Sequence, residues 1–190
     1  MDYGIYKNVR NASWQCLIDC GITSLPVPVS DICELYNGKV INNSDIHKLK
    51  ASESGRIYAI DGYPYVVVND NESVQRIRFT IAHELGHYLL GHLGSDITNL
   101  NREYSSIKPI QESEADMFAS RLLAPACVLW GINALTAEQI ASICNISYEA
   151  AKIRAERMEV LRKRGKFLTS PLERQVYKQF ENYIKNNHLK

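Results

Sequence analysis

Apolar residues recur at helical spacing over several stretches of the chain. Residues 3–20 and residues 112–123 place apolar side chains three or four positions apart, which predicts helices. Ser73 is a candidate N-cap for a further helix that follows it. The segment 56–69 instead contains two runs of β-branched and aromatic residues separated by Asp61-Gly62. Because Asp-Gly suits a two-residue hairpin turn, this segment predicts a β-hairpin.

The segment 135–158 has the pattern of a helix-turn-helix. Thr136 and Gln139 have the spacing of a capping box, and Asn145 tolerates the left-handed conformation that the turn requires. The second helix of this pair is expected to expose Tyr148, Lys152 and Arg154. Such a pair either reads DNA or serves as a plain packing unit.

The C-terminal segment combines an apolar stripe with an excess of positive charge. The stripe of a predicted amphipathic helix is formed by Leu172, Val176, Phe180 and Ile184. From Lys152 to Lys190, eleven Lys or Arg stand against four Asp or Glu, whereas the rest of the chain has eleven against seventeen. This basic tail is either a solvated helical face or a docking surface for an acidic partner or nucleic acid.

Length and composition are typical of a soluble protein. We expect one domain over residues 1–134 and a helical region over 135–190. Because no apolar run reaches the length of a membrane span and the start lacks the apolar centre of a signal peptide, we expect a cytoplasmic protein with no membrane partner. The five cysteines are odd in number and form no CxxC pair, which argues against a disulfide framework and a cysteine zinc site.

The candidate chemistry lies in the pattern HExxH at His83 to His87. Residues four apart lie on the same face of a helix, so the two imidazoles can bind one metal ion. Glu84 lies beside this pair, where its carboxylate can reach a water in an open position of the metal. This arrangement predicts metal-assisted hydrolysis of a peptide bond, with Zn²⁺ as the ion.

A third protein ligand is expected, because a catalytic zinc keeps three protein ligands and one open position. Glu112 and Asp116 are four apart in the helical segment that follows. We expect Glu112 to complete the coordination, while Asp116 accepts the outer N–H of a ligating histidine. Glu114 is the rival ligand, although it lies about 200° around the helix from Glu112.

The sequence does not have the metzincin pattern HExxHxxGxxH. Leu90 and Leu93 occupy the positions of its glycine and third histidine. His92 comes one residue early and follows Gly91, which is expected to end the helix. His92 is therefore interpreted as a surface or capping residue, with the role of metal ligand as the alternative.

The segments RFTIAHELGHYLLGH and ESEADMFASRLLAP resemble the ImmA/IrrE family of zinc-dependent peptidases. The resemblance covers residues 78–125, and Asp116 stands where many members have Asn. It implies a zincin-like α+β fold, mostly helical, with a small twisted sheet of about three strands packed on the HExxH helix. It also implies a bacterial or phage-borne peptidase whose substrate is a transcriptional repressor.

A mechanism follows for a zinc endopeptidase. Glu84 would take a proton from the attacking water and pass it to the leaving amine. Candidate donors to the oxyanion are His92, Tyr88 and Tyr104. The segment Tyr65 to Asn69 is either an edge strand that holds the substrate as an added strand or a purely structural strand.

A second hypothesis belongs to a different class of protein. In it, the chain is a regulator that binds DNA or a repressor through residues 135–158 and the basic tail, and zinc serves only for folding. A closed structural site would exclude water, whereas HExxH with one carboxylate leaves a position open. The ligand set therefore favours catalysis.

Overall fold

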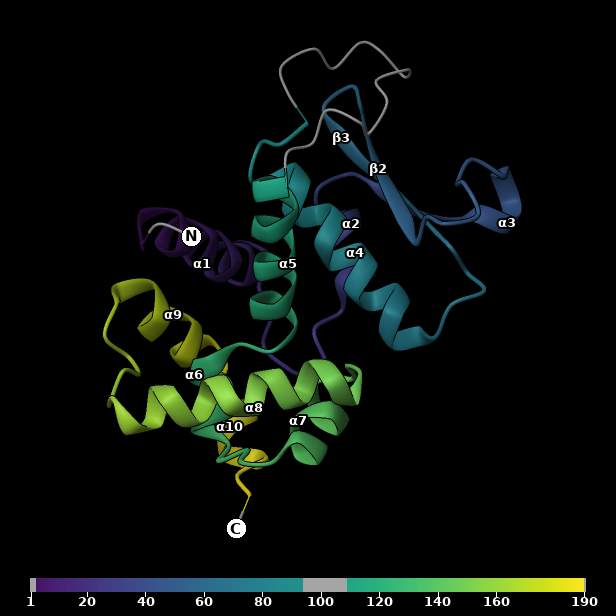
Figure 1. The fold of residues 1–190 in the computed structure, drawn as a ribbon. Coiled ribbons are helices and arrows are strands. Elements are labelled where there is room, and N and C mark those ends of the chain that lie inside the picture. Colours follow the sequence, from purple (N-terminus) through teal and green to yellow (C-terminus); the bar gives the residue numbers. More distant parts are fainter. Residues whose placement is uncertain (1–2, 94–108, 190) are drawn as a thin grey trace. The chain divides into compact units, whose positions relative to one another are not determined.

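The computed structural model describes residues 3–93 and 109–189 and is mostly helical, with one small sheet (Figure 1). The strands are β1 (Lys39–Asn42), β2 (Gly55–Ile60) and β3 (Tyr63–Val68). The helices are α1 (Tyr3–Asp19), α2 (Val29–Leu35), α3 (Asn43–Ile46), α4 (Val74–Leu89), α5 (Pro109–Leu123), α6 (Ala126–Gly131), α7 (Ala137–Cys144), α8 (Tyr148–Lys163), α9 (Pro171–Gln179) and α10 (Glu181–Asn186). The predicted fold class, a mostly helical α+β protein with a sheet of three strands, is confirmed.

The described residues form two compact units. The first contains residues 3–12, 29–93 and 109–119, and the second contains residues 13–28 and 120–189. Helices α1 and α5 contribute residues to both units. The expected division at residues 134 and 135 stays a prediction, and the grouping of residues 13–28 with the C-terminal helices was not anticipated.

The sheet of the first unit has the strand order β1-β3-β2. β2 and β3 form the predicted antiparallel hairpin, with Ile60 opposite Tyr63 and a turn in which Asp61 and Gly62 have φ of 52° and 82°. β1 joins β3 from the other side in parallel register. The prediction of an edge strand at Tyr65 to Asn69 is therefore wrong, because β3 is the central strand and is paired on both sides.

Helices α2 and α4 pack on this sheet. α4 contacts both strands of the hairpin, as Figure 1 shows, and α2 contacts β1, β3 and α4. Gly38, between α2 and β1, permits a close backbone approach, because a Cβ there would lie 1.9 Å from the carbonyl oxygen of Pro64. The sheet and α2 together support the helix that carries the two histidines.

In the second unit, α7 and α8 form the predicted helix-turn-helix-like pair. Thr136 and Gln139 make the expected capping box, and Asn145 has a left-handed φ of 49°. Tyr148 and Lys152 are exposed as predicted. The exposure predicted for Arg154 is wrong, because its guanidinium is part-buried and donates a hydrogen bond to the carbonyl of Ala124.

The C-terminal apolar stripe lies on two helices, whereas one was predicted. α9 ends at Gln179 and α10 begins at Glu181, and between them Phe180 has φ −89° and ψ 6°. Val176, Phe180 and Ile184 are buried, so the stripe faces the core of its own unit. None of the helices in the described residues combines the length and the apolar character needed to cross a membrane.

Candidate metal centre

Helix α4 presents both histidines of the HExxH pattern on one face. The helix begins after Ser73, whose hydroxyl accepts a hydrogen bond from the backbone N–H of Arg76 at 3.3 Å, the N-cap that the sequence predicts. Apolar residues of its other turns, such as Ile81, Ala82 and Leu85, are buried. The packing of this apolar face fixes the direction in which the histidines point.

A close approach between α4 and α5 brings the third donor to the histidines. A Cβ at Gly86, within the HExxH pattern, would lie 3.2 Å from both the Cα of Ala115 and the Cδ1 of Phe118. A glycine at this point therefore lets the backbone of α5 come close to α4. Glu112 lies one turn before Ala115 on α5, so this contact determines where its carboxylate lies relative to the two histidines.

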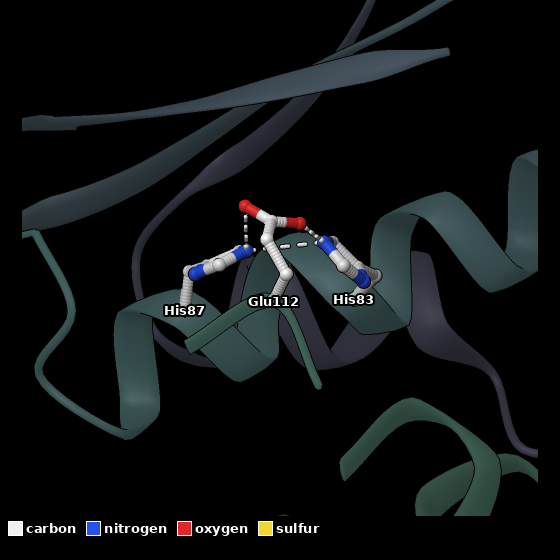
Figure 2. A group of neighbouring side chains, drawn as sticks. All are labelled: His83, His87 and Glu112. Carbon is white, nitrogen blue, oxygen red and sulfur yellow. Dashed lines mark hydrogen bonds and ion pairs between the residues drawn. The ribbon is translucent and has the colours of Figure 1, made fainter. Parts of the chain in front are cut away.

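His83, His87 and Glu112 converge on one point, as Figure 2 shows. The Nε2 atoms of the two histidines are 3.0 Å apart. The two carboxylate oxygens of Glu112 lie 3.3 Å from His83 Nε2 and 3.6 Å from His87 Nε2. These are the three residues that the spacing of the sequence selects as ligands.

The donor set fits a zinc ion. Two imidazole nitrogens and one carboxylate oxygen are a ligand set found in catalytic zinc sites. A tetrahedral zinc with ligand distances near 2.05 Å would separate its ligand atoms by about 3.3 Å. The two histidine nitrogens are 3.0 Å apart, and each has one of the two Glu112 oxygens nearby, at 3.3 Å from His83 and 3.6 Å from His87. The three residues therefore have both the chemistry and the spacing to hold such an ion.

Glu84 lies on α4 between the two histidines in sequence and is 3% exposed. Its negative charge interacts with His83 and favours the protonated form of that ring. A buried carboxylate beside a metal-binding group has the character of a general base, because few waters compete for its oxygens.

Asp116 contacts the outer nitrogen of His83. Its Oδ1 lies 2.9 Å from His83 Nδ1, on the side of the ring away from Glu112. Burial lowers the pKa of His83, but the hydrogen bond to Asp116 and the carboxylates of Glu84, Asp116 and Glu112 raise it more, so the pKa lies above its ordinary value. The structure thus brings Asp116 to the atom at which the sequence predicts it.

His87 is in contact with a second histidine, His92, which was interpreted from the sequence as a surface or capping residue. His92 Nδ1 lies 3.0 Å from His87 Nδ1, and His92 Nε2 lies 3.0 Å from Glu114 Oε2. The side chain of His92 is only 6% exposed, so its interpretation as a surface residue is wrong. Its interpretation as a capping residue agrees with the hydrogen bond from its backbone N–H to the carbonyl of His87 at the end of α4. Glu114, the rival ligand, points to His92 rather than to the metal cluster.

The buried position of His87 affects its protonation. Burial and the neighbouring rings of His83 and His92 lower the pKa of His87 to about 3. The ring is therefore neutral at pH 7, which is the form in which histidine binds a metal ion.

The two candidate oxyanion donors that lie in the described residues make other contacts. The hydroxyl of Tyr88 donates to the carbonyl oxygen of Gly62 at 2.7 Å and thereby ties α4 to the hairpin turn. The ring nitrogens of His92 contact His87 and Glu114. Tyr104 lies outside the described residues. The oxyanion donor stays unassigned.

Comparison with known proteins agrees with this geometry. A family model described as the IrrE N-terminal-like domain, of peptidase family M78, matches residues 42–156, more than half of the chain. The chain belongs to this family. A search of curated proteins finds no match.

Membership of the IrrE N-terminal-like family confirms the resemblance drawn from the two motifs. Because this is a peptidase family, membership supports metallopeptidase activity on a protein substrate. The matched range extends well beyond the motifs, from the end of β1 into α8. It therefore includes the hairpin, all the residues of the candidate metal centre and most of the helix pair α7–α8.

Proposed function

We propose that this protein is a zinc-dependent endopeptidase in which His83, His87 and Glu112 hold the ion. The observation that carries the proposal is the convergence of these three donors beside the buried carboxylate of Glu84. A zinc ion bound there would polarise the scissile carbonyl and lower the pKa of a water molecule.

Three residues of the chain have the other roles in the proposed reaction. Glu84 takes a proton from the attacking water and delivers it to the leaving amine. Asp116 accepts the Nδ1 proton of His83 and keeps Nε2 free for the ion. Glu112 is the third protein ligand. With three protein ligands, the fourth coordination position of the ion stays open for water or substrate.

The substrate is proposed to bind at the edge of β2 that faces away from β3, an edge that pairs with no other strand among the described residues. Ile60 and Tyr63 flank a two-residue turn, so the backbone groups of Arg56, Tyr58 and Ile60 face β3. Those of Gly55, Ile57 and Ala59 then point away from the sheet. Gly55 also packs against Thr80, one turn before His83, so this edge runs beside the helix of the metal centre.

This edge can be tested with Ala59→Pro, which removes one outward N–H at a position where an edge strand tolerates proline. We expect a higher KM with little change in thermal stability. An unchanged KM for a folded variant would exclude this edge as the binding strand.

The substrate class that the family resemblance favours is a helix-turn-helix transcriptional repressor in the cytoplasm. Co-expression with the repressor-like proteins of the source genome, followed by mass spectrometry of the fragments, would identify it. Glu84→Gln is the matched control, because it should retain about one zinc per chain while kcat falls by about 10²- to 10⁴-fold. Cleavage at the wild-type rate by this variant would disprove the mechanism.

The alternative of a DNA-binding regulator receives little support from the charges on α7 and α8. The exposed charged residues of α7 and of the first nine residues of α8 are Glu138, Glu149, Lys152 and Glu156. This surface is acidic, whereas phosphate contacts need Lys or Arg. A gel shift without salt-dependent binding would exclude this alternative.

A further inference from the structure

The face of His87 that points away from the metal cluster carries a buried chain of contacts. His87 Nδ1 meets His92 Nδ1 at 3.0 Å, and His92 Nε2 meets Glu114 Oε2 at 3.0 Å. We propose that His92 and Glu114 are positioning residues that set the tautomer of His87, an inference that rests on the proposed zinc site.

The end of α4 places His92 against His87. After Leu90, Gly91 adopts a left-handed φ of 73° and its N–H bonds to the carbonyl of Tyr88 at 3.1 Å. The N–H of His92 bonds to the carbonyl of His87 at 2.9 Å. These two bonds define a Schellman motif, in which the residue after the glycine packs back on the residue five positions before it. That pair is usually apolar, but here it consists of two imidazoles.

The hydrogen-bonding capacities of the groups select one arrangement of protons. The carboxylate of Glu114 can only accept, so His92 must carry its proton on Nε2. The Nδ1 of a neutral His92 is then an acceptor, and His87 must donate to it from its own Nδ1. His87 Nε2 then carries no proton and directs its lone pair at His83 and Glu112, which is what a metal ligand requires.

The reverse arrangement would disable the site. If His92 carried its proton on Nδ1, His87 would have to accept at Nδ1 and carry its own proton on Nε2. That proton would occupy the position of the ion. The charge of Glu114 disfavours this state, although the residue lies two contacts away from the metal ligands.

Burial makes this chain difficult to replace with water. His87 is fully buried, and the side chains of His92 and Glu114 are 6% and 17% exposed. A residue that only filled space here could be replaced by an apolar side chain without any change in the tautomer of His87. A positioning residue could not, and this difference provides the test.

The test uses two variants of the full chain, His92→Phe and Glu114→Gln. His92→Phe removes the relay, and we expect zinc affinity, measured by competition with a chelator, to fall by about 10- to 100-fold. Glu114→Gln keeps size and shape but removes the charge that selects the tautomer, so we expect a fall of about tenfold. Nitrogen-15 NMR of the metal-free protein should show the His87 proton on Nδ1 in the wild type and a mixture of tautomers in Glu114→Gln.

Glu34→Gln, at an exposed position of α2 in the same unit, is the control for loss of one negative charge and should change neither measurement. If His92→Phe does not fold, Glu114→Gln decides alone. Wild-type zinc affinity and an unchanged His87 tautomer in the folded variants would overturn the relay. If the wild type itself bound no zinc, the proposed function would fail, while the tautomer measurement on the metal-free protein would still decide the relay.

Discussion

The two histidines of the metal cluster are supported in different ways. The outer nitrogen of His83 contacts the carboxylate of Asp116, whose side chain is 60% exposed. His87 has no exposed surface, and its outer nitrogen contacts the ring of His92, which in turn contacts the carboxylate of Glu114. Both arrangements offer an acceptor to the outer nitrogen of the ring, but water can replace only the exposed one. We therefore expect the His87 side to be the more sensitive of the two.

The two supports also differ in their origin along the chain. Asp116 comes from α5, one turn after Glu112, so the same helix supplies a ligand and the partner of another ligand. His92 comes from the end of α4 itself, placed by the turn at Gly91. One side of the site thus depends on the packing of two helices, and the other depends first on how a single helix ends.

The largest expected difference is in the titration of the metal-free protein. In the unfolded chain both histidines have a pKa of about 6.5. In the fold, burial and the neighbouring rings lower the pKa of His87 to about 3, whereas carboxylates raise that of His83 despite its burial. His87 should therefore reduce stability as pH falls from about 6.5 towards 3, and the stabilisation from protonated His83 should be lost as pH rises through its raised pKa. Histidine NMR would contradict this if both rings titrated together near 6.5.

Gly86→Ala should affect both sides of the site. The added Cβ would meet the Cα of Ala115 and the ring of Phe118 at 3.2 Å, and backbone there can give way only if α5 moves. Overpacking costs about 1–3 kcal/mol, and the gain in helix propensity of about 1 kcal/mol offsets part of it. We expect a small loss in the free energy of unfolding and a larger loss of zinc affinity, measured by denaturation and chelator competition. Unchanged zinc affinity would show that this contact does not position Glu112.

Gly91→Ala should weaken only the His87 side. Gly91 has open space around it, so an added Cβ costs only the strain of φ 73°, about 1 kcal/mol. Gly165, which ends α8 with φ 56° and the same pair of hydrogen bonds, provides a matched control away from the site. Both variants should lose similar stability in denaturant, but only Gly91→Ala should bind zinc more weakly. Equal zinc affinities in the two variants would argue against a link between the helix end and the metal site.

The smallest effect is expected for Asp116→Asn. The amide oxygen can still accept the proton of His83 Nδ1, and the site is exposed enough for water to assist. We expect zinc affinity to fall less than in Glu114→Gln, by less than about tenfold. An effect larger than that of Glu114→Gln would reverse the comparison between the two sides.

Much of the metal centre could be predicted because its signals are local. The i, i+4 spacing of His83 and His87 needs only a helix, and the same spacing of Glu112 and Asp116 needs only a second one. The hairpin at Asp61-Gly62 and the capping box at Thr136 also depend on only a few adjacent residues, so they could be predicted.

The features that were missed depend on contacts distant in sequence or on details of a turn. No local pattern in Tyr65 to Val68 shows that β1 will pair with this strand. The central position of β3 in the sheet could therefore not be predicted from the sequence. The spacing within α8 predicts an exposed Arg154, whereas the structure leaves it part-buried, with a hydrogen bond to the carbonyl of Ala124 thirty residues earlier. The contact of His92 with His87 did carry a signal, because a glycine that stops a helix returns the next residue towards the final turns.

The second unit has a consequence for synthesis of the protein. The side chain of Gln179 in α9 donates hydrogen bonds to the backbone carbonyls of Leu17 and Ile22, at 2.7 and 2.6 Å. Gln179 lies more than 150 residues after both of these carbonyls, so the stretch that contains Leu17 has to wait until α9 has left the ribosome. A nascent chain that stops short of α9 would leave this early segment without its anchor and open to proteases and chaperones.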